Sequence, residues 1–370
     1  MWEVLLFTDS IKCGSASGGK LLDKMDKDTS RHIVVSKTGS LKNARIETTP
    51  ILTPGPGEVT VRVAAIGLNF ADLFAIWGLY SATPDVPFVP GFEVSGEITE
   101  LGQGVDGLKT GQRIMAATRF GAYSEKLVLP SWRVAVLPKG WSFEEGAAFL
   151  TTFLTAHYGL HTLGQVRPDQ RVVVHSAAGG VGSAALQLAT ASSCSIFATV
   201  GSDTKIQYVR NLGIKFVLNY RQEDFLKWIR EVTENQGVDV VLDSIGGRMT
   251  RLNYLALRPR GRLVCFGSGS WTPTGSRPNW LKLASNYLFS RPTFAPLDMI
   301  SENKTIAGFN LIWLTDHRDM LHKHLEALLE LVAAGTIRPL VGRVFPFEQY
   351  YEALTWLQSG RSTGKVVLKV

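Results

Sequence analysis

The sequence predicts an α/β protein in which a doubly wound parallel sheet accompanies a separate, β-rich domain. Short β-branched runs alternate with helical segments over residues 171–268, which is the order of a parallel sheet covered by helices on both faces. The first 150 residues differ, because they hold mostly short strands separated by Gly and Pro. A chain of 370 residues is long enough for two domains that each bury a core.

Composition and charge exclude several classes of protein. No run reaches about eighteen consecutive apolar residues, so we expect no membrane-spanning helix. The formal net charge is +7, but Lys and Arg are scattered, which argues against nucleic acid and fits an anionic cofactor or peripheral contact with an anionic membrane. The three cysteines, Cys13, Cys194 and Cys265, lie far apart, which favours a reducing, cytoplasmic location and argues against structural zinc.

Residues 1–30 are rich in Gly, Ser, Lys and Asp, and we interpret them as a flexible extension. Their acidic residues do not suit a transit peptide. Met25 lies near the end of this stretch, so a later start of the protein stays open.

The β-rich part begins at about residue 32. Its strand-like runs have the spacing of an antiparallel barrel or sandwich. One short apolar helix, Phe70–Trp77, interrupts them, and Asn69 is a favoured residue to cap it. The expected strands lie within residues 32–39, 44–54, 57–69, 94–102, 111–118, 122–130 and 134–138.

After this part the pattern changes to helix and then to alternating strands and helices. Residues 142–163 read as one helix, opened by a capping box of Ser142 and Glu145. Expected parallel strands lie at residues 171–175, 195–200, 215–220, 239–245, 262–268 and 306–314. The last run, KVVLKV, is similar to the β-rich half, so we expect the chain to return to its first domain.

A glycine turn at residues 177–182 is the strongest local motif. The three glycine positions of the dinucleotide pattern G-x-G-x-x-G hold Ala177, Gly179 and Gly182 here. The first position thus has alanine in place of glycine, and Gly180 is an additional glycine. The helix that follows points its amino end at the turn, where a diphosphate is favoured. A tight turn in an unrelated α/β domain is the alternative.

The end of the next strand favours NADPH over NADH. An acid at this place would hold the ribose of NAD, but the residue is Gly201. Ser202, Lys205, Tyr220 and Arg221 follow nearby and suit an extra phosphate. The alternative is that Asp203 reaches the ribose and Lys205 is a solvated helix residue.

Several blocks together resemble the zinc-independent quinone oxidoreductases of the medium-chain dehydrogenase/reductase superfamily. They read GLNFADLFAIWGLY, PGFEVSGEI, AAGGVG, TVGSDTK, LNYRQEDF and VLDSIGG, and two more, NKTIAGFNL and VFPFEQYYEAL, are most similar to the synaptic-vesicle membrane protein homologue branch. The resemblance implies a GroES-like catalytic domain at residues 31–155 and 336–370. It implies an inserted Rossmann domain that binds NADPH at residues 156–335.

The resemblance also implies site residues. The matching cleft positions, expected to be catalytic, are Asn69, Asp72, Tyr80 and Thr155. A terminal Arg or Lys near the cofactor is either Arg361 or Lys365. With the motifs above, the expected cofactor contacts are Gly179, Gly180, Val181, Gly182, Gly201, Ser202, Lys205, Tyr220, Phe266, Gly267, Ser268 and Lys365.

No metal is expected. A catalytic zinc needs three protein ligands from Cys, His and acid. The stretches that supply them in zinc alcohol dehydrogenases here hold Leu68 and Phe92, which leaves Glu93 as a buried structural acid. His157 and His161 have i, i+4 spacing but lack the acid of an H-E-x-x-H motif.

The expected reaction is hydride transfer from NADPH to a quinone or an α,β-unsaturated carbonyl, because neither needs zinc activation. Tyr80 or Asn69 would donate a hydrogen bond to the developing oxyanion. Asp72 would orient Asn69 or its loop. Two alternatives are an NADPH-binding interaction or membrane-associated protein with residual reductase activity, and an enoyl thioester reductase.

A homodimer is also expected. The apolar run 306–314 is too rich in β-formers to be left as a bare sheet edge. An isologous pair of such strands would extend both sheets across a two-fold axis. Burial of the run inside one chain is the alternative.

Overall fold

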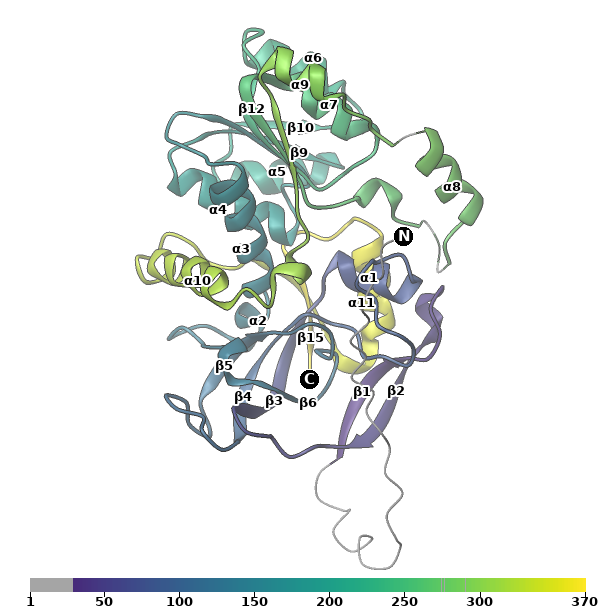
Figure 1. Cartoon of the computed structure of the whole chain (residues 1–370), viewed down its shortest axis with the longest axis vertical. Helices are drawn as coiled ribbons and strands as arrows, with labels where there is room; N and C mark the ends of the chain where they lie inside the picture. The colour runs from purple at the N-terminus through teal and green to yellow at the C-terminus, as the bar shows by residue number, and fades with distance from the viewer. Residues whose placement is uncertain (1–28, 274, 276, 290) are drawn as a thin grey trace, which may run out of the picture.

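The structure is a computed structural model that describes residues 29–273, 275, 277–289 and 291–370 (Figure 1). The expected extension of residues 1–30, with Met25, therefore lies almost wholly outside the described residues. Thr29 and Ser30 are described, and both belong to the first strand, β1 (Thr29–Val35).

The β-rich half is a seven-stranded sheet with a two-stranded ribbon, β1–β2, beside it. The sheet order is β14-β15-β3-β4-β5-β7, and β6 pairs with β3. The last strand, β15, runs antiparallel to β3, so the end of the chain lies in this half as its sequence predicted. The strands are β2 (Ala44–Pro50), β3 (Glu58–Gly67), β4 (Glu93–Leu101), β5 (Arg113–Ala117), β6 (Lys126–Pro130), β7 (Val134–Val136), β14 (Val341–Pro346) and β15 (Lys365–Lys369).

The other half is a parallel sheet in the order β10-β9-β8-β11-β12-β13. The first strand in sequence, β8, lies inside the sheet, and the order reverses beside it, which makes the doubly wound arrangement. The predicted fold class is therefore confirmed. The strands are β8 (Arg171–Val174), β9 (Ser195–Val200), β10 (Phe216–Asn219), β11 (Val238–Asp243), β12 (Leu257–Cys265) and β13 (Thr305–Gly308).

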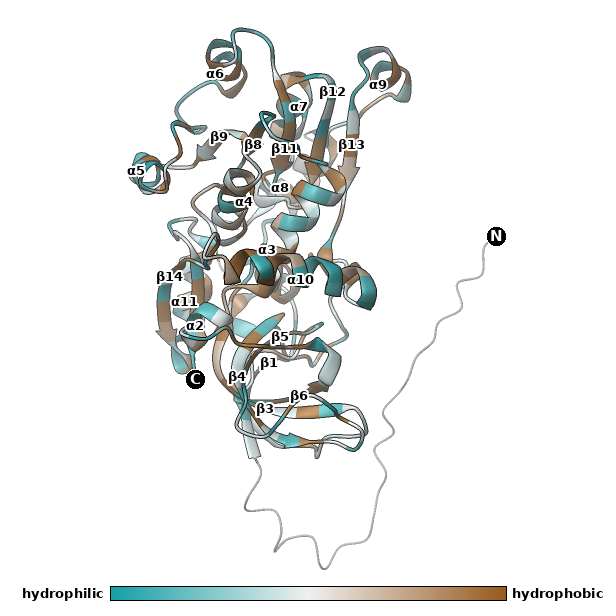
Figure 2. Cartoon of the chain, turned by 90° about the vertical axis from the view of Figure 1, so that its left-hand side faces the viewer, coloured by the Kyte–Doolittle hydropathy of each residue, from teal (hydrophilic) through white to brown (hydrophobic). Residues whose placement is uncertain are grey.

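Helices cover both faces of the parallel sheet and join it to the β-rich half. In Figure 2, α3 and α10 lie between the parallel sheet above and the β-rich sheet below. The helices are α1 (Phe70–Trp77), α2 (Phe143–Gly146), α3 (Leu150–His157), α4 (Gly180–Ala191), α5 (Asp203–Asn211), α6 (Phe225–Val232), α7 (Arg248–Ala256), α8 (Trp280–Phe289), α9 (Pro296–Glu302), α10 (Arg318–Ala333) and α11 (Tyr350–Gln358). Short 3-10 helices are η2 (Leu41–Asn43), η3 (Ser131–Arg133), η5 (Gly269–Trp271), η6 (Leu311–Leu314) and η7 (Phe347–Gln349).

No helix among the described residues is both long and apolar enough to cross a membrane.

The prediction of one continuous helix over residues 142–163 is wrong. The predicted capping box is present, since Ser142 accepts from the Glu145 N–H and Glu145 accepts from the Ser142 N–H. The helix then breaks after α2 and continues as α3 and a π-helical segment, η4 (Tyr158–Leu163). The break lies where the Ala147 carbonyl meets Gly67 of β3, at which a Cβ atom would come within 2.0 Å of that oxygen. Close packing on β3 therefore overrides the helical pattern.

The strand expected over residues 306–314 is also only partly correct. β13 ends at Gly308, and residues 311–314 form the 3-10 helix η6. The Phe309 ring turns inward against Tyr158 and Phe266, with ring centroids 5.0 and 5.9 Å away. Asn310 accepts a hydrogen bond from Tyr80 of the β-rich half. These contacts draw the chain out of the sheet.

Candidate active site

A cleft of about 740 Å³ is lined by residues of both halves. Its walls come from the β3–α1 and β8–α4 connections, from α3, from the segments after β12 and β13, and from the start of β15. The expected site residues that line it are Asn69, Tyr80, Thr155, Gly179, Gly180, Val181, Gly182, Phe266, Gly267, Ser268 and Lys365. The expected residues Asp72, Gly201, Ser202, Lys205 and Tyr220 do not line it.

The glycine turn forms as its sequence predicted. β8 ends at Val174, and α4 begins at Gly180 with Gly179 as its N-cap. A Cβ atom on Gly182 would lie 2.3 Å from the Ser176 carbonyl oxygen, so only glycine allows helix and strand to pack this closely. Gly180, Val181 and Gly182 of the first turn of α4 line the cleft, and the amino end of a helix favours an anionic group.

Basic side chains lie beside Gly201, directly after the end of β9. A Cβ atom on Gly201 would lie 3.3 Å from Arg221 Nε and 3.5 Å from the Tyr220 hydroxyl. Lys205 donates to the Gly360 carbonyl at 2.7 Å, and burial together with the Arg221 charge lowers its pKa to about 8. Arg221 and Tyr220 thus lie directly over the Gly201 backbone, where a larger side chain would crowd them, and cationic groups of this kind suit a phosphate.

Asp203 is turned toward other partners. Its carboxylate accepts from Asn219 Nδ2 at 2.8 Å and from Gln222 Nε2 at 3.3 Å. The alternative in which Asp203 binds a ribose would require these bonds to be exchanged.

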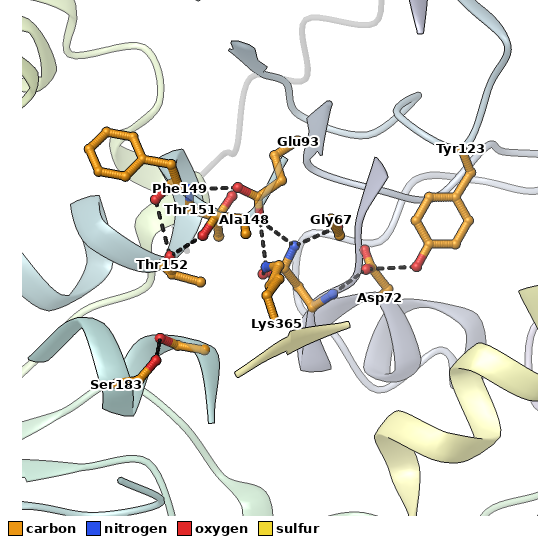
Figure 3. Close-up of polar contacts among 12 residues, drawn as sticks. Gly67, Asp72, Glu93, Tyr123, Ala148, Phe149, Thr151, Thr152, Ser183 and Lys365 are labelled. Atoms are coloured by element: carbon orange, nitrogen blue, oxygen red, sulfur yellow. Dashed lines mark hydrogen bonds and ion pairs between the residues drawn. The ribbon is translucent and has the colours of Figure 1, made fainter. Parts of the chain in front are cut away.

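A buried ion pair of Lys365 and Glu93 lies at the cleft (Figure 3) and contacts one of the expected catalytic residues, Asn69. Lys365 donates from Nζ to Glu93 Oε1 at 2.5 Å and to Asn69 Oδ1 at 2.7 Å. The other carboxylate oxygen of Glu93 accepts from the Thr151 N–H at 3.0 Å. The side chains of Lys365 and Glu93 are only 4% and 1% exposed, so each charge depends on the other for compensation.

This network fixes the amide of Asn69. Asn69 Nδ2 donates to the Gly67 carbonyl and to Glu93 Oε1, both at 3.2 Å. Both amide hydrogens are therefore occupied, and the amide has no free donor for an acceptor oxygen. The expectation that Asn69 itself donates to the oxyanion does not fit this geometry, whereas a role in positioning Lys365 does.

Asp72 lies below the cleft rather than in its wall. Its Oδ2 accepts from the Asn69 N–H at 2.7 Å and from the Tyr123 hydroxyl at 2.9 Å. Burial raises the pKa of Asp72 from its ordinary value of 3.8 to about 7, although both hydrogen bonds and the Lys365 charge oppose the shift. Asp72 thus holds the start of α1, which agrees with the expected orienting role.

Tyr80 and Thr155 remain in the cleft. The Tyr80 hydroxyl donates to Asn310 Oδ1 at 2.8 Å, a contact that joins the two halves, and burial raises its pKa to about 12. Thr155 of α3 also lines the cleft. A neutral phenol is a hydrogen-bond donor, so Tyr80 can donate to an acceptor oxygen if it gives up its bond to Asn310.

Of the two terminal candidates, Lys365 lies in the cleft. Arg361 instead stacks over Trp356, 4.5 Å from the ring centroid, and its Nε donates to Ser359 Oγ. The pairing of Lys365 with Glu93 and the parts played by Tyr123 and Asn310 were not predicted from the sequence. The position of Lys365 at the start of the mostly apolar run KVVLKV was a signal that this lysine needs a polar partner.

The donor set does not fit a catalytic zinc. Leu68 and Phe92 stand where ligands are needed, and the Lys365 ammonium occupies the remaining acid, Glu93. His157, His161 and His324 do lie together, with His157 Nδ1 and His324 Nδ1 2.7 Å apart. Within the described part of the chain, however, no group of three or more His, Cys, Asp or Glu is arranged to hold a metal ion.

Comparison with known proteins covers nearly the whole chain. The family described as alcohol dehydrogenase GroES-like domain matches residues 55–139, and the family described as zinc-binding dehydrogenase matches residues 212–368. A curated relative, the synaptic vesicle membrane protein VAT-1 homolog of Rattus norvegicus, is 34% identical over 341 residues, which are 91% of this chain and 83% of the relative.

Solved structures are similar over 92% of this chain. A quinone oxidoreductase of Pseudomonas syringae is 29% identical, is covered over its full length and has a TM-score of 0.80. A mycobacterial protein complexed with NADPH is 28% identical, is also fully covered and has a TM-score of 0.81. CurK enoyl reductase is 30% identical, is covered over 99% of its length and has a TM-score of 0.78.

Proposed function

Because the chain belongs to the zinc-independent quinone oxidoreductase family of the medium-chain dehydrogenase/reductase superfamily, we propose that it transfers hydride from NADPH to a quinone or another α,β-unsaturated carbonyl. The chain is an oxidoreductase of that superfamily, on the branch of the VAT-1 homologues. One observation carries the finer proposal. The same cleft holds a dinucleotide turn on one side and apolar side chains around the Tyr80 hydroxyl on the other.

The residues fit the cofactor at two places. The amino end of α4 would hold its diphosphate, because Gly182 and its neighbours bring bare backbone N–H groups to the cleft. Lys205, Tyr220 and Arg221 would hold the additional phosphate of NADPH beside Gly201. A similar protein is complexed with NADPH, which supports this choice. Bound NADPH would supply the hydride at its nicotinamide C4.

The other residues act on the acceptor and on one another. Thr155 and the segment of Phe266, Gly267 and Ser268 border the space for the nicotinamide. Tyr80 would exchange its bond to Asn310 for one to the acceptor oxygen, where negative charge develops. Asn69, Glu93 and Lys365 hold each other, while Asp72 fixes the loop from below.

We further propose a division of labour and an assembly. Residues 31–155 and 336–370 act as the catalytic domain, and residues 156–335 bind NADPH. Two copies pair through β13, which is the last strand of the parallel sheet and has no neighbour on its outer side among the described residues.

A second candidate is reduction of enoyl thioesters. The similarity to CurK enoyl reductase supports it. Such a substrate has the same conjugated carbonyl, so Tyr80 would serve in the same way. A third candidate, an NADPH-binding protein with an interaction role and residual turnover, is supported only by the name of the VAT-1 relatives.

Turnover separates these candidates. The protein is dialysed against a chelator and then given NADPH with quinones, enones or a crotonyl thioester, while NADPH absorbance is followed. We expect steady oxidation with a quinone or enone, undiminished by chelation. Faster turnover of the thioester would favour the second candidate. Tight NADPH binding without turnover of any acceptor would favour the third, and loss of activity with removal of bound zinc would refute metal independence.

A further inference from the structure

Three arginines and two tryptophans gather beside the cleft, and we call these residues the arginine cluster: Arg119, Arg133, Arg318, Trp132 and Trp313. Arg133 and Arg318 both lie over the Trp132 ring, 4.6 and 4.3 Å from its centroid. Arg119 lies over Trp313 at 4.8 Å. The five side chains come from segments around β5, η3, η6 and the start of α10. The fold therefore collects three cations that are distant in sequence.

The arginine cluster adjoins the substrate end of the cleft. Ala117 and Thr118, which precede Arg119, line the cleft, and so does Ile312, which precedes Trp313. A smaller cavity of about 50 Å³, lined by Trp132 and Arg133, shares Ala117, Leu154, Thr315 and Leu321 with the cleft. The Arg119 charge is also close enough to the Tyr80 hydroxyl to lower its pKa, against the larger effect of burial.

The charges of the arginine cluster are not balanced. Among the described residues, Asp316 is the only carboxylate paired with it, at 3.0 Å from Arg133 and 3.7 Å from Arg119. Asp316 is 66% exposed, whereas the Arg133 side chain is only 13% exposed. Burial lowers the pKa of Arg133, and the charges of Arg119 and Arg318 lower it further. The carboxylate of Asp316 opposes this shift. One exposed carboxylate is a weak partner for three guanidinium groups, so a further anion would be stabilised here.

Guanidinium groups held over aromatic rings are well suited to bind an anion. The stacking fixes their planes, while their N–H groups stay free to donate to a carboxylate or a phosphate in pairs. The Trp rings give an apolar surface on which a hydrocarbon chain leaving the cleft can lie.

We propose that the arginine cluster binds an anionic group, a carboxylate or a phosphate, that the acceptor carries at a distance from its conjugated carbonyl. The substrates would then be quinones or enones with an acidic tail. The reacting end lies at Tyr80, and the chain passes Thr118 and Thr315 to reach the guanidinium groups. This inference rests on the proposed function, because it takes the cleft to be the acceptor site.

Three matched acceptors test the inference. They are 3-nonen-2-one, the same enone with a terminal carboxylate, and the same enone with a terminal phosphate monoester. For the wild type with NADPH, we expect kcat/KM to be about tenfold higher or more for the anionic acceptor that the site prefers than for the neutral one. The advantage should shrink as salt is added. Comparison of the two anionic acceptors distinguishes carboxylate from phosphate recognition.

Variants assign the effect to the arginine cluster. In Arg119→Gln and Arg318→Gln, the ratio of kcat/KM between anionic and neutral acceptor should fall toward one, most of all in the double variant. Arg343→Gln is the matched control. Arg343 also stacks on aromatic rings, those of Phe345 and Trp356, but none of these three residues lines the cleft or the smaller cavity that the arginine cluster borders. It should keep the wild-type ratio.

Binding keeps the test independent of turnover. The saturated, unreactive ketones with and without the acidic tail are titrated into the protein by calorimetry. If no enone is reduced, the proposed function fails, and tighter binding of the acidic ketone in wild type alone still supports the anion site. Equal kcat/KM and equal affinity for neutral and anionic compounds would overturn the inference. So would an acidic preference that survives in the double variant.

Discussion

Two buried acids near the cleft, Glu93 and Asp72, differ in the groups that compensate their negative charge. Glu93 has the Lys365 ammonium 2.5 Å away, whereas Asp72 accepts hydrogen bonds only from neutral donors, the Asn69 N–H and the Tyr123 hydroxyl. A carboxylate that is buried without a direct cation favours its protonated form. Asp72 is therefore the residue at which proton uptake and folding are coupled.

We predict that Asp72 makes the protein less stable as the pH rises from about 4 to about 7. Its pKa is 3.8 as the ordinary value and about 7 in the folded protein, so the folded state binds the extra proton in this window. The favourable contribution is complete below the ordinary pKa, is lost as pH rises through the folded pKa, and does not change further above it.

Urea denaturation of wild type and Asp72→Asn checks this. Asparagine keeps an acceptor for Asn69 and Tyr123 but does not ionise. Between about pH 5 and pH 8, the free energy of unfolding of wild type should fall relative to the variant by on the order of 2 to 3 kcal/mol. A difference that stays constant with pH, or grows in the other direction, would refute the assignment.

Lys205 should decide between NADPH and NADH. Each charge-assisted contact to a phosphate contributes roughly 1.5 to 3 kcal/mol, so Lys205→Ala should weaken NADPH binding by about tenfold or more. NADH binding should change little, since NADH lacks that phosphate. Fluorescence titration measures both affinities. Lys215→Ala is the control, because Lys215 is exposed and lies over the Phe216 ring, whereas Lys205 lies near the Arg221 charge beside Gly201. Equal losses for both cofactors would show that Lys205 supports the fold rather than the phosphate.

At the scale of elements, the Lys365–Glu93 pair ties the beginning of β15 to the beginning of β4 and, through Asn69, to α1. The pair lies where three segments distant in sequence meet, and its Lys365 lines the cleft. Removal of one partner should destabilise the protein strongly, because it leaves the other charge buried without compensation.

We predict that Lys365→Met lowers the free energy of unfolding by roughly 3 to 5 kcal/mol. Adding Glu93→Gln to this variant removes the lone charge and should restore much of the loss, although both variants lose the ammonium from the cleft. Urea denaturation of wild type, the two single variants and the double variant gives the four free energies of unfolding of a double-mutant cycle. If the double variant is as unstable as the sum of the single ones, the two residues do not act as a pair.

At the scale of the whole molecule, the chain after α11 connects the two halves. Lys205 of α5 donates to the Gly360 carbonyl, and the Gly364 N–H donates to the Ala178 carbonyl of the glycine turn at 2.7 Å. Gly364 also forms an isolated parallel bridge with Gly179, immediately before Lys365 enters the β-rich sheet. Residues 360–365 thus touch both ends of the proposed cofactor site and its catalytic side, which links cofactor binding to the placement of Lys365.

We predict a homodimer joined at the outer edge of β13. Sedimentation velocity at micromolar concentration should give twice the monomer mass. Thr305→Lys places a charge on the exposed edge and should weaken the dimer, whereas Ser301→Lys on α9 should not. Phe309 is unsuitable for this test, because its ring packs inside the chain. A monomeric wild type at this concentration would refute the proposed interface.

Features that depend on local patterns could be predicted from the sequence alone. Helix α1, strand β9 and the glycine turn follow from hydrophobic period, capping and glycine content, all of which are set by neighbours along the chain. The resemblance of several sequence blocks then led to the family and to a minority of the residues that line the cleft.

Features that depend on contacts between distant residues could not be predicted in this way, because they arise in the folded chain. The helix over residues 142–163 breaks because the Ala147 carbonyl meets Gly67, and the run 306–314 leaves the sheet because Phe309 and Asn310 find partners elsewhere. The choice of Lys365 over Arg361, the partner of Glu93 and the gathering of Arg119, Arg133 and Arg318 have the same origin. Burial and charge pairing across the folded chain set these outcomes, and no window along the sequence contains both members of such a pair.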